Sequence, residues 1–236
     1  MKIIIFVIFA IITLCLFIWF LVNVSRDVSR DVFSRKDTDI RLHSIATEVR
    51  GTTSTPIYIL DNFLTGDECD AIMNSILDKL VPSPLTRQDP NDSKFRTSRT
   101  AYFSNDNIHH YINTKMMNIL DIHDISLSEL PQVQHYNVGD EFKAHWDFFD
   151  PSIDKSFYDN GQRTWTFMVY VTDVEEGGET YFTKLDETIK PQKGRGVIWC
   201  NIKENSDMDR NTMHQGKPVV KGEKGIITKW YKLSNN

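Results

Sequence analysis

This sequence has few cysteines, no excess of basic charge and no glycine-rich phosphate-binding motif. Its 236 residues include three cysteines, too few to indicate a disulfide framework. The formal net charge of −5 excludes the strongly basic balance of a nucleic-acid binder. Neither GxGxxG nor GxxxxGK followed by Ser or Thr occurs in the sequence. We therefore expect no nucleic-acid partner and no loop of the usual phosphate-binding kind.

Charge is missing altogether from residues 3–22, which are almost entirely apolar. A helix of about 20 residues, rising 1.5 Å per residue, spans the roughly 30 Å hydrocarbon core of a bilayer. A cleaved signal peptide is the alternative, but its apolar core is shorter, about 7–15 residues, and a small-x-small cleavage site follows it. No such site follows here. We predict one transmembrane helix over residues 1–24, acting as a signal-anchor.

Residues 25–55 are polar, end in a Thr/Ser-rich run and predict a stalk or linker. Four basic residues follow the apolar segment, whereas only Lys2 and the amino terminus precede it. The positive-inside rule alone would leave the C-terminal part in the cytoplasm. The four basic residues are Arg26, Arg30, Arg35 and Lys36.

Helix signals come first in residues 56–236, and strand signals follow. Thr65, with Glu68 three residues later, predicts a capping box at the start of a helix that runs to about residue 80. A second helix is predicted over residues 107–120. Later runs of β-branched and aromatic residues, separated by glycine-containing turns, predict short strands. The fold class is therefore α+β and β-rich, a sandwich or barrel backed by helices. These runs are residues 131–139, 164–172, 196–202 and 225–232.

The segment "EFKAHWDFFD", residues 141–150, alternates polar and apolar residues with the period of a β-strand. Lys143, His145 and Asp147 would then share one face. An imidazole and a carboxylate on one face are either a surface pair or two metal ligands. The opposite face would carry Phe142, Ala144, Trp146 and Phe148.

A third ligand would have to come from elsewhere, and His214 is the best candidate, with His135 the alternative. Two histidines and one carboxylate hold non-haem Fe(II) and leave coordination positions open. In the run after His214, Lys224 would share a strand face with Ile226 and Trp230, so it either reaches solvent or pairs with a buried anion. The other histidines are His43 in the stalk, His109 and His110 on the outer run of a helix, and His123 in a loop.

These motifs resemble the prolyl 4-hydroxylase family of Fe(II)- and 2-oxoglutarate-dependent dioxygenases. The resemblance covers residues 56–236 and is densest from residue 132 onward. Its pattern is HxD, a distant His, and a Lys ten residues later, which here is His145, Asp147, His214 and Lys224. The fold that it implies is a double-stranded β-helix (jelly roll) core with supporting N-terminal helices.

The resemblance also implies roles for the site residues. His145, Asp147 and His214 would bind Fe(II), and Lys224 would pair with the distal carboxylate of 2-oxoglutarate. In relatives, the positions of Tyr136 and Thr180 bind that same carboxylate. Trp230 would lie near the co-substrate. Substrate contacts fall on Arg163, on Arg96 at the end of a mobile loop, and on Phe142, where relatives often carry a tyrosine.

The implied activity is hydroxylation of peptidyl proline to 4-hydroxyproline by a membrane-anchored enzyme that uses O2 and releases succinate and CO2. L-ascorbate would sustain the iron, and the substrate would be a proline-rich or collagen-like peptide. The alternatives are a 2-oxoglutarate oxygenase that acts on another residue or a small molecule, a non-catalytic proline-rich peptide-binding module, and a zinc hydrolase. Members of the family usually have their catalytic domain in the lumen of the endoplasmic reticulum or secretory pathway, and the resemblance implies the same here. The basic residues after the apolar segment favour the opposite orientation. Oligomeric state is left open.

Overall fold

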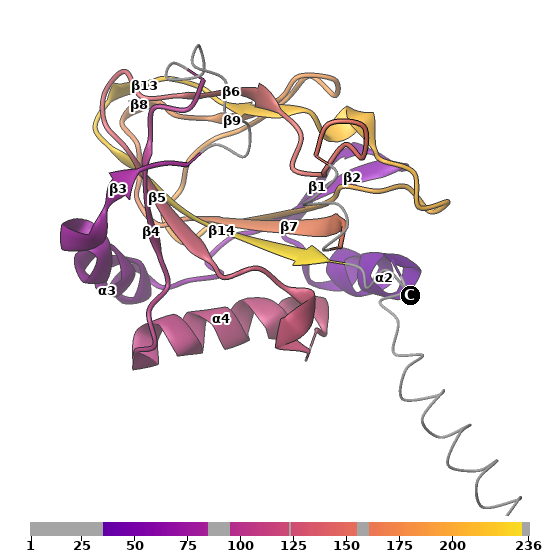
Figure 1. The fold of residues 1–236 in the computed structure, drawn as a ribbon, viewed down its shortest axis with the longest axis horizontal. Coiled ribbons are helices and arrows are strands. Elements are labelled where there is room, and N and C mark those ends of the chain that lie inside the picture. The colour runs from indigo at the N-terminus through magenta and orange to yellow at the C-terminus, as the bar shows by residue number, and fades with distance from the viewer. Residues whose placement is uncertain (1–34, 85–94, 123, 155–160, 233–236) are drawn as a thin grey trace, which may run out of the picture.

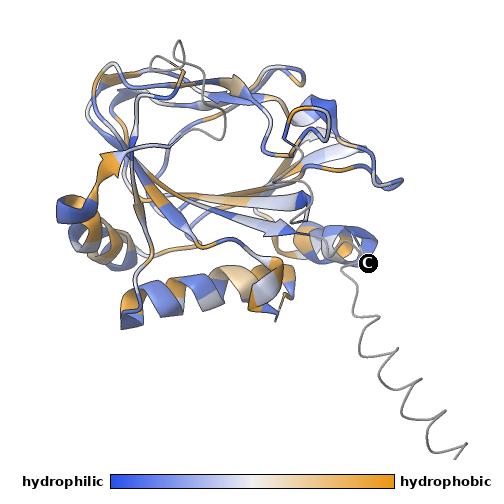
Figure 2. Cartoon of the chain, viewed as in Figure 1, coloured by the Kyte–Doolittle hydropathy of each residue, from blue (hydrophilic) through white to orange (hydrophobic). Residues whose placement is uncertain are grey.

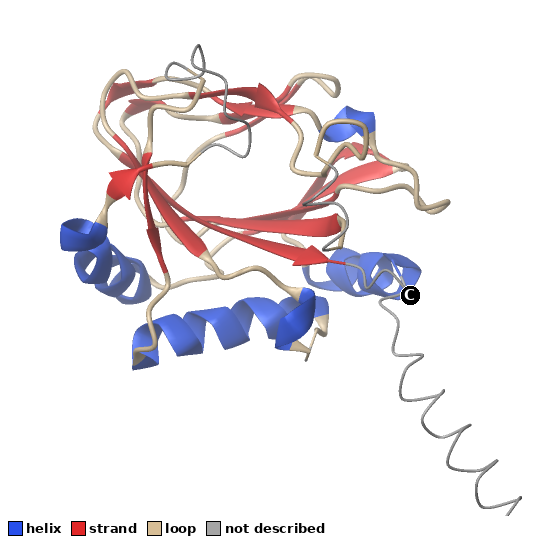
Figure 3. Cartoon of the chain, in the orientation of Figure 1, coloured by secondary structure: helices blue, strands red, loops and turns tan. Residues whose placement is uncertain are grey.

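Two antiparallel β-sheets face one another, and the α-helices cover the outer face of the larger sheet (Figures 1 and 3). The computed structural model describes residues 35–84, 95–122, 124–154 and 161–232. The β-rich prediction is confirmed, and the facing sheets are consistent with a jelly-roll core.

The larger sheet has eight strands in the order β1-β2-β11-β7-β14-β5-β4-β3, and the smaller has four in the order β10-β9-β12-β6. A short ribbon pairs β13 with β8. The large-sheet strands are β1 (Glu48–Thr52), β2 (Thr55–Leu60), β3 (Val81–Pro82), β4 (Arg99–Tyr102), β5 (Gln132–Tyr136), β7 (Arg163–Tyr170), β11 (Gly196–Cys200) and β14 (Lys224–Lys232). The others are β6 (Phe142–His145), β8 (Glu176–Gly177), β9 (Thr180–Phe182), β10 (Glu187–Ile189), β12 (His214–Gly216) and β13 (Val219–Lys221).

The two helices predicted from local signals are both present. The Thr65 side chain accepts a hydrogen bond from the Glu68 N–H at 3.2 Å, and the Glu68 carboxylate accepts one from the Thr65 N–H at 2.8 Å. This confirms the capping box. The α-helix ends at Ile76, earlier than expected, and continues as a short 3₁₀ turn. The helices are α2 (Arg35–Ile45), α3 (Gly66–Ile76) and α4 (Asn107–Leu120), with 3₁₀ turns η1 (Leu77–Lys79), η3 (Ile125–Leu127) and η4 (Arg210–Thr212).

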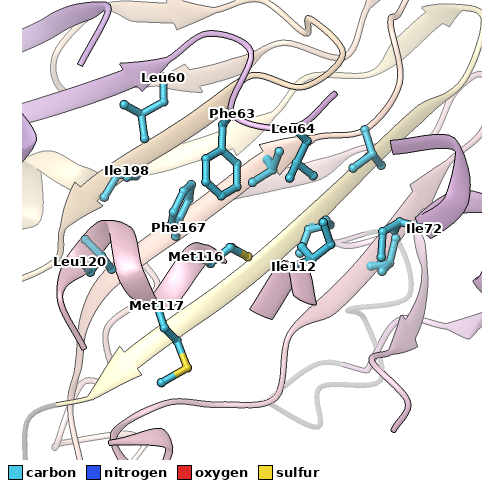
Figure 4. Packing of buried hydrophobic residues seen from close by; sticks show 14 of the residues in the cluster. Leu60, Phe63, Leu64, Ile72, Ile112, Met116, Met117, Leu120, Phe167 and Ile198 are labelled. Carbon is cyan, nitrogen blue, oxygen red and sulfur yellow. The ribbon is translucent and has the colours of Figure 1, made fainter. Parts of the chain in front are cut away.

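Strand alternation divides the core into two layers. On β7, Phe167 faces the helices and packs with Ile112 and Met116 of α4 (Figure 4). The intervening residues Met168 and Tyr170 belong to the layer between the two sheets. The helices combine apolar and polar residues, as expected for elements with one buried face (Figure 2). The period of two therefore turns one face of β7 toward the space where a site can form.

The predicted stalk over residues 25–55 is wrong for its second half. Residues 35–45 form α2, and β1 pairs with β2 at the edge of the large sheet. Leu42 is fully buried in the core, and Tyr58 donates a hydrogen bond to Asp39 at 2.8 Å. No apolar stripe marks this helix in the sequence, because its buried residues are only Thr38 and Leu42.

The predicted membrane anchor, residues 1–24, lies outside the described residues. Among the residues that are described, no helix is long and apolar enough to cross a membrane.

His109 is another correction, because it is buried rather than on the outer face of its helix. Its Nε2 lies 2.9 Å from the Ser75 hydroxyl, and its Nδ1 accepts a hydrogen bond from the Ser104 backbone N–H at 3.0 Å. A carboxylate oxygen of Asp106 also lies 2.9 Å from Nδ1. His109 therefore links α3 to α4 as a structural residue.

Candidate metal centre

The smaller sheet brings two histidines directly opposite each other. His145 ends β6, His214 begins β12, and the two residues are register partners in the antiparallel pair. Their ring centroids lie 4.4 Å apart. Asp147 follows after the strand has ended, so the expectation that one strand face carries both His145 and Asp147 is wrong in detail. The turn after β6 nevertheless brings the carboxylate to the same place.

Backbone carbonyls orient both histidines toward a metal. His145 Nδ1 lies 2.7 Å from the Lys143 carbonyl oxygen, and His214 Nδ1 lies 2.9 Å from that of Thr212. A carbonyl only accepts, so each Nδ1 carries the proton and each Nε2 presents its lone pair. Burial and the neighbouring His214 lower the pKa of His145 to about 3. His145 is therefore neutral at physiological pH, the form that binds metals.

Asp147 completes the group and is 5% exposed. Its Oδ1 lies 3.7 Å from His145 Nε2, and its Oδ2 lies 3.9 Å from His214 Nε2. Burial opposes ionisation, but His214, His145 and Arg163 outweigh it and lower the pKa of Asp147. The ligand atoms of the three residues all lie within 4.8 Å of one another. A set of two imidazoles and one carboxylate fits ferrous iron and leaves open positions for other ligands.

A pocket adjoins this cluster and extends along one face of the large sheet. Tyr136, Thr180, Lys224 and Trp230, all predicted to lie near the co-substrate, line it together with the three candidate ligands. The predicted face of β14 is confirmed, because Lys224, Ile226, Thr228 and Trp230 all point into the pocket. The remaining lining residues are Gln134, Phe142, Met168, Trp199 and Gly216.

Lys224 is 1% exposed, and its Nζ faces the rings of Tyr136 and Tyr170 at 5.0 and 5.7 Å. Across the described ranges no carboxylate lies within ion-pair distance of this Nζ. Burial lowers the pKa of Lys224 to about 7, although Glu179 acts in the opposite direction. A buried amine without an anionic partner fits a carboxylate of the co-substrate at this end of the pocket.

Gly216 keeps space open beside that amine. A Cβ on Gly216 would lie 3.4 Å from Lys224 Nζ and 3.8 Å from the Phe142 side chain. The hydrogen at this position therefore leaves room for an anion next to the lysine.

The other predicted site residues contact partners within the protein that the sequence did not indicate. The Tyr136 hydroxyl donates to Gln134 Oε1 at 3.1 Å, and Thr180 accepts from the Tyr170 hydroxyl at 2.7 Å. Phe142 stacks on the His145 ring with centroids 3.6 Å apart. Arg96 does not line the pocket, but its guanidinium lies 4.8 Å above the Phe142 ring.

Arg163 also lies outside the pocket lining. It binds both oxygens of Glu129, at 2.7 and 2.6 Å, and stacks on the Trp230 ring at 3.7 Å. Its remaining nitrogen donates to the Asp147 carbonyl oxygen at 3.4 Å. The structure thus places Arg163 behind two site residues, with its charge already paired.

Comparison with known proteins agrees with this geometry. Residues 131–232 match the 2OG-Fe(II) oxygenase superfamily. Prolyl 4-hydroxylase 5 of Arabidopsis thaliana is 27% identical over 197 residues, which cover 73% of this chain and 67% of that protein. Prolyl 4-hydroxylase subunit alpha-2 of Gallus gallus is 31% identical over 146 residues, 61% of this chain. The chain is similar to prolyl 4-hydroxylases and to the 2OG-Fe(II) oxygenase superfamily.

Solved structures show the same relationship. The 2OG complex of the viral collagen prolyl hydroxylase from Paramecium Bursaria Chlorella virus-1 has a TM-score of 0.61 and 28% sequence identity, and the match covers 75% of this chain and 96% of that one. A prolyl hydroxylase from Trichoplax adhaerens, at 16% identity and a TM-score of 0.61, shares the fold. The predicted enzyme class, a 2-oxoglutarate-dependent dioxygenase, is confirmed.

The similarity has a limit of length. The match to the Gallus gallus subunit spans 27% of that subunit, and the match to subunit alpha-1 of Rattus norvegicus spans 32%. The shared part is therefore the domain that carries the candidate metal centre.

Proposed function

We propose that this chain hydroxylates peptidyl proline at C4 with Fe(II), 2-oxoglutarate and O2, yielding 4-hydroxyproline, succinate and CO2. The observation that carries the proposal is the pocket itself. It holds a two-histidine, one-carboxylate group at one place and, at another, a buried lysine with no carboxylate of the described residues within ion-pair distance. Similarity to prolyl 4-hydroxylases, including a viral collagen prolyl hydroxylase, supports a proline-rich or collagen-like peptide as substrate.

Each residue has a stated task in this proposal. His145, Asp147 and His214 would hold Fe(II), which supplies the oxygen-activating redox chemistry. Lys224 would bind the distal carboxylate of 2-oxoglutarate, while the hydroxyls of Tyr136 and Thr180 border it. Trp230 and Met168 form an apolar wall of the pocket, and burial of the three candidate metal ligands limits access of water.

Substrate contacts are proposed for Phe142, which stacks on His145, and for Arg96, which stacks on Phe142. Phe142 and Arg96 are both partly exposed and lie in contact with one another, so an extended peptide can reach them. Arg163 would act on the peptide only if Glu129 released it, so we assign it to the support of Trp230 and Asp147.

Mass spectrometry of the full chain in detergent, supplied with Fe(II), 2-oxoglutarate, ascorbate and a panel of proline-rich and collagen-like peptides, tests the activity. We expect one added oxygen on proline and at least a hundredfold loss in His214→Ala, because the metal loses a ligand. His110→Ala, an exposed histidine on α4, is the matched control and keeps wild-type activity.

The outcomes separate the alternatives. Conversion of 2-oxoglutarate to succinate without any change in the peptides would move the proposal to another residue or to a small-molecule substrate. Full activity without O2 would contradict the dioxygenase chemistry and favour a zinc hydrolase. Omitting ascorbate should reduce the number of turnovers without affecting the first.

We also propose that residues 1–24 anchor the chain in a membrane, with the catalytic domain in the secretory lumen. The apolar run supports the anchor, whereas the basic residues after it favour the opposite orientation. Protease treatment of sealed microsomes should leave the domain intact if it is lumenal and digest it if it is cytoplasmic.

A further inference from the structure

A buried chain of hydrogen bonds leads from the core to the carboxylate of the candidate metal centre. Trp199 Nε1 donates to Asn201 Oδ1 at 3.0 Å, and Asn201 Nδ2 donates to the Thr166 hydroxyl at 2.9 Å. The Thr166 hydroxyl donates to Asp147 Oδ2 at 2.7 Å. The first three residues of this chain were not predicted as site residues.

The direction of every bond in this chain is fixed by chemistry. An indole N–H only donates, so it must meet the oxygen of the Asn201 amide. The amide nitrogen then faces Thr166, whose hydroxyl accepts from it and has a single proton left to give. That proton goes to Asp147, since a carboxylate only accepts. No member can be turned around without breaking a bond.

All four members of this hydrogen-bond chain are buried, so water cannot readily replace a lost partner. Trp199 is 1% exposed, Asn201 and Thr166 are 0%, and Asp147 is 5%. A buried polar atom that loses its partner cannot turn to water, at a cost of about 1–3 kcal/mol. Trp199 and Thr166 are also register partners on β11 and β7, so the sheet itself sets their spacing.

The same tryptophan reaches a second candidate ligand. The Trp199 ring lies against His214, with centroids 4.9 Å apart and planes at 66°. It also meets Phe182 edge to face at 5.2 Å. Trp199 therefore packs one ligand and starts the hydrogen-bond chain that orients another.

We propose that Trp199, Asn201 and Thr166 form a positioning relay that holds Asp147 and His214 in fixed relation for metal binding. The hydrogen bond from Thr166 engages Oδ2 of Asp147 and restricts rotation of the carboxylate, which would leave Oδ1 available to bind Fe(II). None of the three is a candidate metal ligand. Of the three, Trp199 alone lines the pocket, where its ring lies against His214. The relay rests on the proposed function only in that the bound metal is Fe(II), and it is tested without co-substrate or peptide.

The test measures Co²⁺ affinity and the Co²⁺ absorption spectrum of the metal-stripped full chain by titration. Thr166→Val keeps the side-chain shape and removes the donor, and Thr166→Ser keeps the donor. We expect T166V to weaken Co²⁺ binding about 10- to 100-fold, the range for loss of a group that orients a ligand, and to change the d–d spectrum. T166S should bind within about threefold of wild type and restore the spectrum.

Asn201→Asp provides a second test of direction. A carboxylate there accepts from both Trp199 and Thr166, so the hydroxyl proton turns away from Asp147 and Co²⁺ binding weakens about tenfold or more. Trp199→Phe keeps an aromatic ring at this position and removes the indole donor together with part of the ring volume, and it should weaken binding about threefold or more. W199F is informative even where T166V does not fold.

Wild-type Co²⁺ affinity and spectrum in folded T166V, or in W199F where T166V does not fold, would overturn the relay. An equal loss in T166V and T166S would do the same, because it would point to packing rather than to the hydroxyl. Absence of peptide hydroxylation by the wild-type chain, with the Co²⁺ results as expected, would overturn the proposed function and leave the relay standing.

Discussion

Lys224 is the residue whose protonation state is most sensitive to the co-substrate. Its pKa of about 7 in the free protein lies below the ordinary value of 10.5 because the amine is buried. A bound carboxylate stabilises the charged form and raises that pKa. Binding of 2-oxoglutarate above pH 7 is therefore accompanied by proton uptake, and affinity falls as pH rises through and beyond 7. Below pH 7 the lysine is already charged, and the uptake disappears.

Calorimetry in two buffers with different ionisation heats measures this uptake at pH 8 and pH 6, with Mn²⁺ in place of iron. We expect close to one proton at pH 8 and little at pH 6. Lys221→Met, a neighbouring lysine with a side chain that is 67% exposed, keeps the uptake, and Lys224→Met loses both uptake and most of the affinity. Equal uptake at both pH values would contradict the assignment.

Gly216 tests the space beside the same amine. In Gly216→Ala, the added Cβ would lie 3.4 Å from Lys224 Nζ and fill part of the volume that an anion needs. We expect about tenfold weaker 2-oxoglutarate binding, about 1.4 kcal/mol, by calorimetry. The control is Gly66→Ala, whose Cβ would meet nothing within 4 Å. Unchanged affinity in both variants would show that the co-substrate does not use this space.

For single residues, the sequence could predict which residue types form the site but not which side chains they contact. HxD is a local motif, and His145 and Asp147 were recognised from it. The choice between His135 and His214 depends on which strand pairs with β6, and distance along the chain does not determine that. Resemblance to a family resolved the choice. Thr166 and Asn201 went unpredicted because a buried polar residue in an apolar strand has no signature of its own beyond alternation.

Among the elements, α2 is the one whose role differs most from expectation. Leu42 is fully buried between α2 and the domain, whereas Ile40 on the same helix is 61% exposed. Leu42→Ala should lower the free energy of unfolding by about 2–5 kcal/mol through loss of burial and a residual cavity. Ile40→Ala should change it by no more than about 0.5 kcal/mol. Urea denaturation measures both, and similar effects would mean that α2 is not docked.

Local signals explain which elements were predictable. The capping box of α3 and the apolar periodicity of α4 lie within one stretch of sequence, and both helices were found. The contribution of α2 depends on one leucine and on contacts with residues far along the chain, such as the bond from Arg35 to the Ile202 carbonyl oxygen at 2.5 Å. A polar helix held by tertiary contacts resembles a linker in sequence.

For the molecule as a whole, the order of strands in the large sheet determines which parts of the domain depend on one another. The class of fold followed from counting strand-like runs, but the order of the strands did not, because antiparallel pairs in this architecture join segments far apart. β14 pairs with β5 on one side and β7 on the other. The residues that line the pocket thus come from strands that only the complete sheet holds together.

The central position of β14 has a consequence for how the protein is made. Strands β1, β2, β11 and β7 form one half of the large sheet, and β5, β4 and β3 form the other. Residues 224–232, which join the halves, are synthesised after all the other strands. Long-range pairing of this kind slows folding and leaves strand edges exposed to other chains in the meantime. During translation, the two halves of the large sheet therefore cannot be joined through β14 until these nine residues emerge, and it is in this interval that a chaperone would protect the chain.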